Sequence, residues 1–268
     1  MTSLRSIKQN RDSWNKLSEQ YLAEVVISDE EVHYGPNSAG ENTLKLLCPL
    51  KGKLVMDLGC GGGQTSVAMA RQGAQVVALD VSDSQVNHGK RLANEAGVVV
   101  EFHVKPAQNV GDLIDSYPKK FDLIFSSFAL PFVDDIERVF QSAWHLLKPT
   151  GKLVIAVDHP VMPLGWTEHQ SNVKEYSYFN PKSERWSLTT GDEELPFNTY
   201  YWTFEGWTNA LFNAGFIITG VKEPELYPVE KVQKSPHYNA EYEEERDIWD
   251  RIPLTLILVA RPNPFGEY

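Results

Sequence analysis

The sequence is poor in the features that mark secreted and membrane proteins. It has only two cysteines, Cys48 and Cys60, too few for a disulfide framework and without metal-ligand spacing. It has no apolar run of the roughly eighteen residues that a membrane-spanning helix needs. Its first residues are polar and lack the apolar stretch of a secretory signal. We therefore expect a cytoplasmic protein that makes no membrane contact and holds no metal.

Basic residues are also scarce. The 25 lysines and arginines stand against 36 acidic residues, and the net charge is −11. A general nucleic-acid surface would need a basic face, whereas the basic residues here are scattered. The composition therefore argues against nucleic acid as a partner, although a local basic groove is compatible with it. No internal repeat is present, and the oligomeric state cannot be deduced from the sequence.

What the sequence does contain is a regular alternation of apolar runs and helical segments. The expected strands are residues 53–58, 74–80, 98–104, 121–128 and 151–158. Helices are expected over residues 64–73, 82–97 and 136–147, from their caps and terminal glycines. Such alternation predicts a parallel sheet covered on both faces. In these sheets ligands bind beyond the carboxyl ends of the strands.

Residues 159–204 break this pattern. They lack clean periodicity, and with the following helix they hold thirteen aromatic residues. An irregular insertion after a central strand predicts a lid over the ligand-binding site at the ends of the strands. Its pocket-facing rings would come from Trp166, Tyr176, Tyr178, Trp186, Tyr200, Tyr201 and Trp202. The alternative is a second small core under a long loop. A helix ending at Gly215 and strands over residues 216–224 and 253–260 would complete the fold.

A glycine-rich turn, Asp-Leu-Gly-Cys-Gly-Gly-Gly (57–63), follows the first strand. Glycines let the backbone approach a ligand and turn into a helix whose first N–H groups are free. The dinucleotide fingerprint would need a glycine at position 64, where this chain has Gln64. The second strand ends in Asp80, whose carboxylate suits the two hydroxyls of a ribose. Taken alone, an aspartate at this place is more often a turn or helix cap.

These motifs resemble those of the class I S-adenosylmethionine-dependent methyltransferases of the type 11 group. The resemblance is tight over residues 53–157, where Phe-Asp-Leu-Ile-Phe-Ser-Ser-Phe (121–128) also fits, and loose elsewhere. It implies a Rossmann-like, doubly wound α/β sheet of seven strands in the order 3-2-1-4-5-7-6, with strand 7 antiparallel. It also implies S-adenosylmethionine as cofactor. The whole chain, residues 1–268, is then expected to be one methyltransferase domain, with residues 1–50 as a helical cover and 159–204 as the lid insertion.

The resemblance implies which residues hold the cofactor. They are Gly59, Cys60 and Gly61 at its methionine end, Asp80 at the ribose, Val81 at the adenine, and also Ser126 and Tyr21. One family feature is missing, because Lys-Pro-Ala-Gln-Asn (105–109) replaces the segment whose aspartate reaches the adenine amine. Gln108, Asn109 or the backbone there is expected to make that contact instead.

The residues expected around the acceptor are Tyr34, Tyr201 and Trp202. The last two stand where the family has His and Arg, which implies a less anionic and more aromatic or apolar acceptor. The family's histidine after the fourth strand is replaced by Pro131. His159, just after the fifth strand, could be a general base, since an unperturbed imidazole titrates near neutrality, or a structural hydrogen-bonding residue. The sequence leaves both open.

We therefore predict methyl transfer to a small organic acceptor through a nitrogen, oxygen or carbon nucleophile. A sulfonium methyl group is already electrophilic, so proximity, orientation and exclusion of water would carry most of the catalysis. One alternative is a tRNA or protein methyltransferase, which the Ala-Gln-Asn-Val string (107–110) suggests and the acidic charge opposes. The other is a regulator that binds S-adenosylmethionine without catalysis. Turnover would exclude the regulator.

Overall fold

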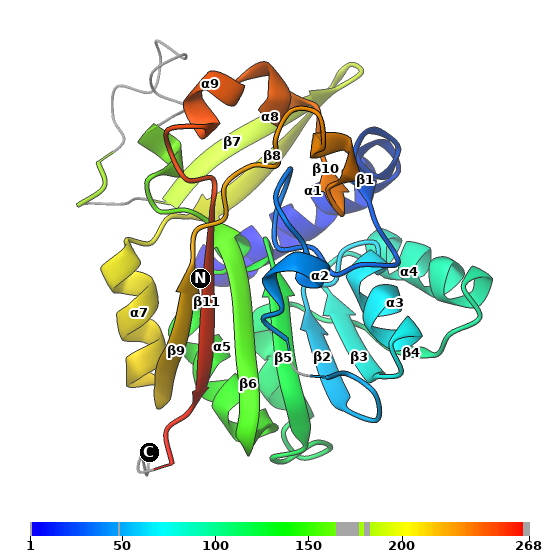
Figure 1. The fold of residues 1–268 in the computed structure, drawn as a ribbon, viewed down its shortest axis with the longest axis vertical. Coiled ribbons are helices and arrows are strands. Elements are labelled where there is room, and N and C mark those ends of the chain that lie inside the picture. The colour runs from blue at the N-terminus through cyan, green and yellow to red at the C-terminus, as the bar shows by residue number, and fades with distance from the viewer. Residues whose placement is uncertain (1, 48, 165–176, 180–182, 265–268) are drawn as a thin grey trace.

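A seven-stranded sheet forms the centre of the computed structural model, which describes residues 2–47, 49–164, 177–179 and 183–264 (Figure 1). Its order is β4-β3-β2-β5-β6-β11-β9. The strands are β2 (Leu54–Leu58), β3 (Gln75–Asp80), β4 (Val100–Val104), β5 (Phe121–Ser127), β6 (Leu147–Asp158), β9 (Phe216–Lys222) and β11 (Thr255–Pro262). The pairs from β4 to β6 are parallel, and β11 runs antiparallel to both β6 and β9. Counted along the chain, this is the order 3-2-1-4-5-7-6, and the predicted fold class is confirmed.

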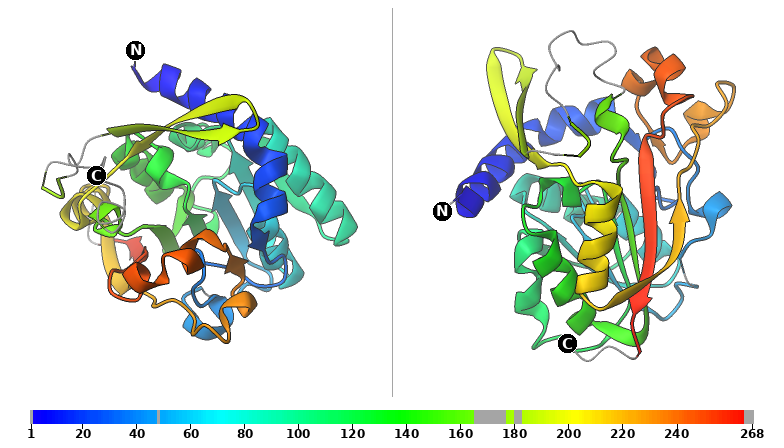
Figure 2. Two further views of the ribbon diagram at one scale, coloured as in Figure 1. Left: turned by 90° about the horizontal axis from the view of Figure 1, so that it is seen from above. Right: turned by 90° about the vertical axis from the view of Figure 1, so that its left-hand side faces the viewer.

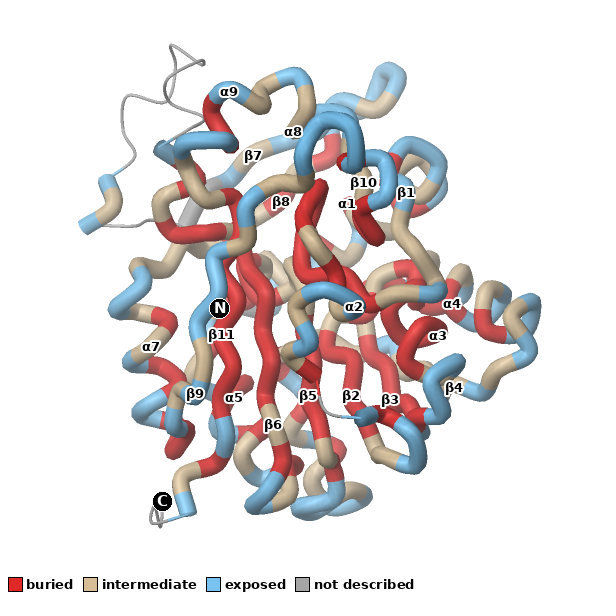
Figure 3. Tube along the Cα trace, viewed as in Figure 1, coloured by how far each residue is buried: buried red, intermediate tan, exposed pale blue. Residues whose placement is uncertain are grey.

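Both faces of the sheet are buried under helices, and the five inner strands are buried along most of their length, whereas the edge strands β4 and β9 are largely accessible (Figure 3). One core contains residues of α5 (Ile136–Leu146) and α7 (Phe204–Asn213), and the other contains residues of α3 (Gln64–Arg71). Val55 and Met56, neighbours on β2, belong to opposite cores. A strand buried on both faces needs apolar residues at every position, which explains the continuous apolar runs in the sequence.

Side-chain caps fix where three of the helices begin. Ser82 Oγ accepts a hydrogen bond from Gln85 N at the start of α4 (Asp83–Glu95), and Asp135 caps α5 through Arg138 N. Thr203 caps α7 through Gly206 N. Each cap satisfies a backbone N–H that would otherwise lack a partner. Strand β6 begins at Leu147, four residues before the predicted residue 151, and Leu147 pairs with Phe121 of β5.

A layer of short elements lies over one end of the sheet. The long helix α1 (Thr2–Glu24) crosses that end, with the hairpin of β7 (Ser183–Thr190) and β8 (Glu193–Tyr200) beside it (Figure 2). The other elements of the chain are β1 (Val26–Ile27), α2 (Glu41–Leu44), η1 (Ala107–Leu113), η2 (Leu130–Phe132), η3 (Val232–Lys234), β10 (His237–Tyr238), α8 (Glu241–Glu244) and α9 (Arg246–Trp249). Strand β1 pairs with β10, which joins the N-terminal and C-terminal parts of this layer. None of the described helices is long and apolar enough to cross a membrane.

The described part of the segment 159–204 is more regular than the sequence suggested. Strands β7 (Ser183–Thr190) and β8 (Glu193–Tyr200) form an antiparallel hairpin that turns at Gly191, where φ is +58°. The buried side of β8 packs against α1, in a cluster that includes Leu17, Leu195 and Phe197. The expectation of an irregular segment is therefore wrong for the hairpin. Trp166 and Tyr176 lie outside the described residues.

Candidate active site

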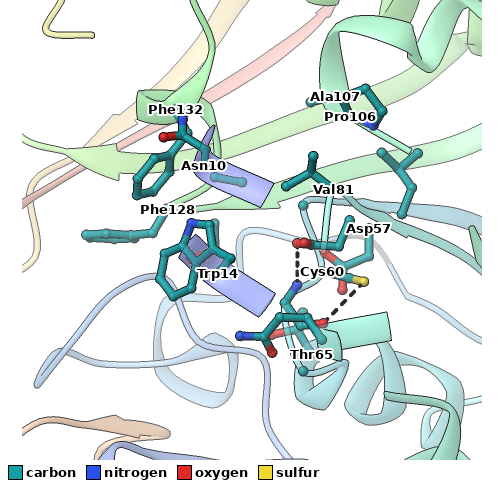
Figure 4. Close-up of a pocket in the computed structure, with 18 of the residues that line it drawn as sticks. Asn10, Trp14, Asp57, Cys60, Thr65, Val81, Pro106, Ala107, Phe128 and Phe132 are labelled. Atoms are coloured by element: carbon teal, nitrogen blue, oxygen red, sulfur yellow. Dashed lines mark hydrogen bonds between the residues drawn. The ribbon is translucent and has the colours of Figure 1, made fainter. Parts of the chain in front are cut away.

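A cavity of about 160 Å³ opens at the carboxyl ends of β2, β3 and β5, where the topology of a doubly wound sheet places ligands. Residues 59–62 after β2 and residues 127–129 after β5 line it from the sheet side. Helix α1 closes it with Asn10, Trp14 and Tyr21. Trp14, Phe128 and Phe132 gather on one side of the cavity, while Val81, Pro106 and Ala107 lie on the other (Figure 4).

The glycines of the turn after β2 differ in the space that surrounds them. All of Gly59, Gly61 and Gly63 have positive φ, at 78°, 51° and 83°. A Cβ on Gly59 would lie 2.1 Å from Cβ of Ala129, and one on Gly63 would lie 2.7 Å from Cα of Gly89. At Gly61 no atom lies within 4 Å of that position, and the residue lines the cavity. Packing therefore explains Gly59 and Gly63, whereas Gly61 leaves space that a ligand can fill.

Asp80 joins the end of β3 to the glycine turn. Its Oδ2 accepts a hydrogen bond from Gly61 N at 3.0 Å, and its Oδ1 accepts one from Ser82 N at 2.9 Å. Burial raises the pKa of Asp80, and these backbone donors act in the opposite direction. Each carboxylate oxygen has a further lone pair, so the group can still accept two hydroxyl donors from the cavity. Capping the turn and binding a ribose are thus compatible roles.

Asp57 and Cys60 form the buried base of the turn (Figure 4). Asp57 Oδ2 accepts a hydrogen bond from Ser66 Oγ at 2.6 Å, which links β2 to α3. Burial raises the pKa of Asp57 to about 7. Burial, together with Asp80 and Asp57, raises the pKa of the Cys60 thiol well above its ordinary value. Cys60 is therefore a neutral packing group rather than a reactive thiolate.

Seven of the residues singled out from the sequence meet in this cavity: Tyr21, Gly59, Cys60, Gly61, Asp80, Val81 and Gln108. Asn109 is exposed and lies outside the lining, although its neighbour Gln108 is buried there. Ser126 is fully buried, and its Oγ donates to Leu58 O at 2.7 Å, so its hydroxyl joins β5 to β2. The structure therefore brings together most of the expected cofactor residues and leaves out Asn109 and Ser126.

The residues expected around the acceptor and the expected base lie elsewhere. Tyr34 is fully buried in the core against Phe125, and its hydroxyl donates to Glu41. His159 lies outside the cavity lining, with Nε2 2.7 Å from Glu223 Oε1 and Nδ1 accepting from Val161 N. This geometry corresponds to the structural alternative for His159. Burial lowers its pKa, and Glu223 acts in the opposite direction.

The expected aromatic lid does not line the cavity in the described part of the chain. Tyr201 and Trp202 are absent from the lining, and Trp202 packs against Trp207 of α7, with ring centroids 6.4 Å apart. Trp186 stacks on Phe197, with centroids 4.7 Å apart, within the hairpin. Trp186 thus joins a small cluster under the hairpin, as the alternative interpretation of the segment held, whereas Trp202 packs against the larger core that contains α5 and α7.

The aromatic side of the cavity is formed by residues that the sequence did not single out. Trp14 of α1 packs edge-on against Phe132 of η2, with centroids 5.6 Å apart. Phe128 directly follows β5 and has a φ of +56°, a strained conformation for an aromatic residue that is most often found at functional sites. Two buried histidines, His33 and His237, complete this part of the lining. Within the described residues, no group of His, Cys, Asp and Glu could hold a metal ion.

The known proteins to which this chain is similar in sequence include methyltransferases. Residues 56–155 match a family described as "Methyltransferase domain". The chain is 31% identical over 184 residues to the uncharacterized methyltransferase YbaJ of Bacillus subtilis, a match that covers 65% of this chain and 70% of YbaJ. It is 37% identical over 108 residues to the ubiquinone biosynthesis O-methyltransferase of Xylella fastidiosa (strain 9a5c). That second match spans 40% of this chain and 43% of that enzyme.

Solved structures agree with the sequence relatives. A structure from Listeria monocytogenes assigned to the S-adenosylmethionine-dependent methyltransferases has 25% identity and a TM-score of 0.63, over 82% of this chain and 94% of that one. The fold is also shared with an S-adenosylmethionine-dependent methyltransferase of Mesorhizobium loti, at 22% identity and a TM-score of 0.57, over 81% and 94% of the two chains. The space beside Gly61 and the free acceptor sites of Asp80 fit the amino-acid end and the ribose of that cofactor. The chain therefore belongs to the S-adenosylmethionine-dependent methyltransferases, and it is an enzyme that uses S-adenosylmethionine.

Proposed function

We propose that this enzyme transfers the methyl group of S-adenosylmethionine to a small organic acceptor bound against Trp14, Phe128 and Phe132. The observation that carries the proposal is that these rings and the glycine turn line one cavity, which helix α1 closes. Aromatic faces suit an apolar or aromatic acceptor, and they also attract the positive charge of a sulfonium. The bound cofactor supplies an electrophilic methyl group, so the protein's task is to align an acceptor with it and exclude water.

We further propose an orientation for the cofactor within the cavity. Gly59, Cys60 and Gly61 would hold the amino-acid end, and Asp80 would accept both ribose hydroxyls. Val81 and Gln108 would contact the adenine, since Val81 and Ala107, the neighbour of Gln108 in the chain, lie on the side of the cavity opposite the aromatic rings. In this orientation the aromatic rings of Trp14, Phe128 and Phe132 would adjoin the sulfonium end of the cofactor.

Tyr21 and the rest of the N-terminal segment would act as the cover of the site. Asn10 and Asn198 exchange hydrogen bonds of 2.8 and 2.9 Å, and Ser13 Oγ donates to Pro196 O at 2.6 Å. The β7–β8 hairpin thus supports α1 from outside, in place of the lid that the sequence suggested. We propose that residues 1–268 form one methyltransferase domain on this plan, with residues 1–50 as its cover.

The small acceptor is favoured over a tRNA or protein acceptor by charge and by the form of the site. The net charge is −11, and the cavity lies beneath a helix rather than along an open groove. The relatives named as ubiquinone biosynthesis O-methyltransferases support an oxygen nucleophile, although their match covers less than half of their length.

The test combines a binding measurement with a screen for turnover. S-adenosylhomocysteine should bind at one site per chain in a calorimetric titration. The protein should then move label from methyl-labelled S-adenosylmethionine to at least one member of a panel of phenols, carboxylic acids, amines and thiols. Label that appears in tRNA or protein substrates, and in no small molecule, would contradict the proposal. Cofactor binding without any transfer would instead support a non-catalytic regulator.

A further inference from the structure

Two buried histidines from distant parts of the chain meet at the wall of the cavity. His33 precedes the core residue Tyr34, and His237 lies on β10, opposite Ile27 of β1. Their Nδ1 atoms are 3.3 Å apart, and their rings lie edge-to-face with centroids 4.7 Å apart. Only 8% of His33 and 6% of His237 is exposed, and both line the cavity. The small accessible part of this histidine pair therefore faces the cavity.

The histidine pair lies next to the aromatic side of the cavity. Gly35, two residues after His33, lies so close to Phe128 that a Cβ on Gly35 would be 2.7 Å from the Phe128 ring. Phe128 is the residue at which the chain leaves β5, and it is part of the proposed acceptor wall. The loop that carries His33 is thus packed against the acceptor side of the site rather than against the adenine side.

Both rings of the pair are uncharged at neutral pH. Burial lowers the pKa of His33 to about 4, and burial together with the neighbouring His33 lowers the pKa of His237 well below its ordinary value. Three carboxylates on the loops around the pair accept hydrogen bonds from other groups: Glu31 from Asn42 N, Glu41 from Tyr34 and Leu46, and Glu243 from Asn37. Asp57 and Asp80 line the same cavity, but they are bonded to Ser66 and to backbone N–H groups.

Two neutral imidazoles whose Nδ1 atoms are in contact must differ in tautomer. One ring donates its Nδ1–H, and its Nε2 is then an unprotonated acceptor. The other ring accepts at Nδ1, and its Nε2 then carries the proton. The histidine pair therefore offers one basic nitrogen and one N–H donor. A hydroxyl group, which both donates and accepts, matches that combination.

We propose that the histidine pair binds the hydroxyl of a phenol-type acceptor and takes its proton during methyl transfer. This inference rests on the proposed function, and it assigns a substrate class to the same site. The phenol ring would pack on Trp14, Phe128 and Phe132, and its hydroxyl would face the basic Nε2 of the pair. Two polar groups on an otherwise aromatic wall would thus select acceptors that have a proton to lose.

The proposed step balances in atoms and charge. The hydroxyl proton moves to the basic Nε2, the phenol oxygen forms a bond to the methyl carbon, and the carbon–sulfur bond breaks with its electrons going to sulfur. The products are a methyl ether and S-adenosylhomocysteine, and the proton on the ring later passes to solvent. As the oxygen bonds to the methyl carbon it loses electron density, so its proton becomes more acidic and a weakly basic ring can take it.

The test uses 4-nitrophenol, whose ionised form is coloured, with protein saturated with S-adenosylhomocysteine. We expect saturable binding and, near pH 6, a larger coloured fraction when bound than in free solution. His33→Asn and His237→Asn keep a polar atom close to the Nδ1 position but lack the Nε2 atom. We expect each to weaken 4-nitrophenol binding about tenfold or more, with S-adenosylhomocysteine affinity unchanged within twofold. His145→Asn, which changes an exposed histidine on α5 outside the cavity lining, should bind both ligands normally.

A second measurement needs no variant. In protein labelled with ¹⁵N at the histidine rings, added 4-nitrophenol should move one Nε2 signal of the pair toward its protonated position. Absence of binding, equal binding by the pair variants, or unmoved ring signals would overturn the inference. The proposed function would survive any of these results if the panel still showed methyl transfer to an amine, a thiol or a carboxylic acid. It would fail only if no small acceptor were methylated.

Discussion

Replacing Asp80 with alanine should weaken cofactor binding much more than it weakens the fold. The carboxylate is proposed to accept two ribose hydroxyls with the lone pairs that Gly61 N and Ser82 N leave free. Hydrogen bonds to a charged group contribute on the order of 1.5–3 kcal/mol net. Since about 1.4 kcal/mol corresponds to a factor of ten, the loss of even one of these bonds should raise the dissociation constant for S-adenosylhomocysteine by about 10- to 140-fold.

The fold should tolerate the change, because burial of the ionised Asp80 carboxylate lowers the free energy of unfolding. Burial raises the pKa of Asp80, so the folded chain binds this proton more tightly than the unfolded chain does, and ionisation of the group lowers the stability of the fold. Asp80→Asn removes that cost and keeps one oxygen for the turn. Its thermal unfolding midpoint should therefore lie within a few degrees of the wild-type value.

Calorimetric titration with S-adenosylhomocysteine provides the assay, with Asp83→Ala as the matched control. Asp83 lies three residues further along, is exposed, and bonds Asn15 rather than lining the cavity. Its variant should bind normally. An Asp80→Ala protein that is folded and binds within twofold of wild type would remove Asp80 from the cofactor site, and with it the proposed orientation of the cofactor.

Three further predictions follow from the site. Gly61→Val should abolish S-adenosylhomocysteine binding by calorimetry, because its side chain would fill the open space beside the turn; retained affinity would make the turn a mere connection. Because burial raises the pKa of Asp57 to about 7, the folded state holds a proton that the unfolded chain releases near pH 4, so stability due to this group falls as pH rises between those values. Urea unfolding of Asp57→Asn should lack that part of the pH dependence, and an identical pH profile would contradict the shift. Trp14→Ala should raise the KM for a methylated acceptor about tenfold, whereas Trp202→Ala should leave it unchanged; the reverse result would restore the predicted lid.

The sheet and the cofactor half of the site were predictable because their signals are local. The turn at residues 57–63 joins a strand directly to a helix, and Asp80 ends the next strand, so adjacent parallel strands bring them together. The alternation of Leu195, Phe197 and Thr199 on β8 was also present in the sequence. It was hidden by the neighbouring aromatic residues, which suggested an irregular lid.

The acceptor half depends on contacts that no local pattern encodes. His33 and His237 are 204 residues apart, and the strands β1 and β10 that align them have two residues each. His159 follows β6 as expected, but Glu223, 64 residues further along, holds its ring away from the cavity. Tyr34 was expected at the site because its segment resembles the family, but its ring packs in the core against Phe125 and its hydroxyl donates to Glu41.

The most direct test of the account is a crystal structure of the protein with S-adenosylhomocysteine. We expect the ribose hydroxyls on the Asp80 carboxylate, the amino-acid end against Gly61, and the adenine beside Val81. The sulfur should then face Phe128 and the histidine pair. A ligand bound elsewhere, or bound here with its ribose away from Asp80 and its sulfur away from the aromatic wall, would contradict the account.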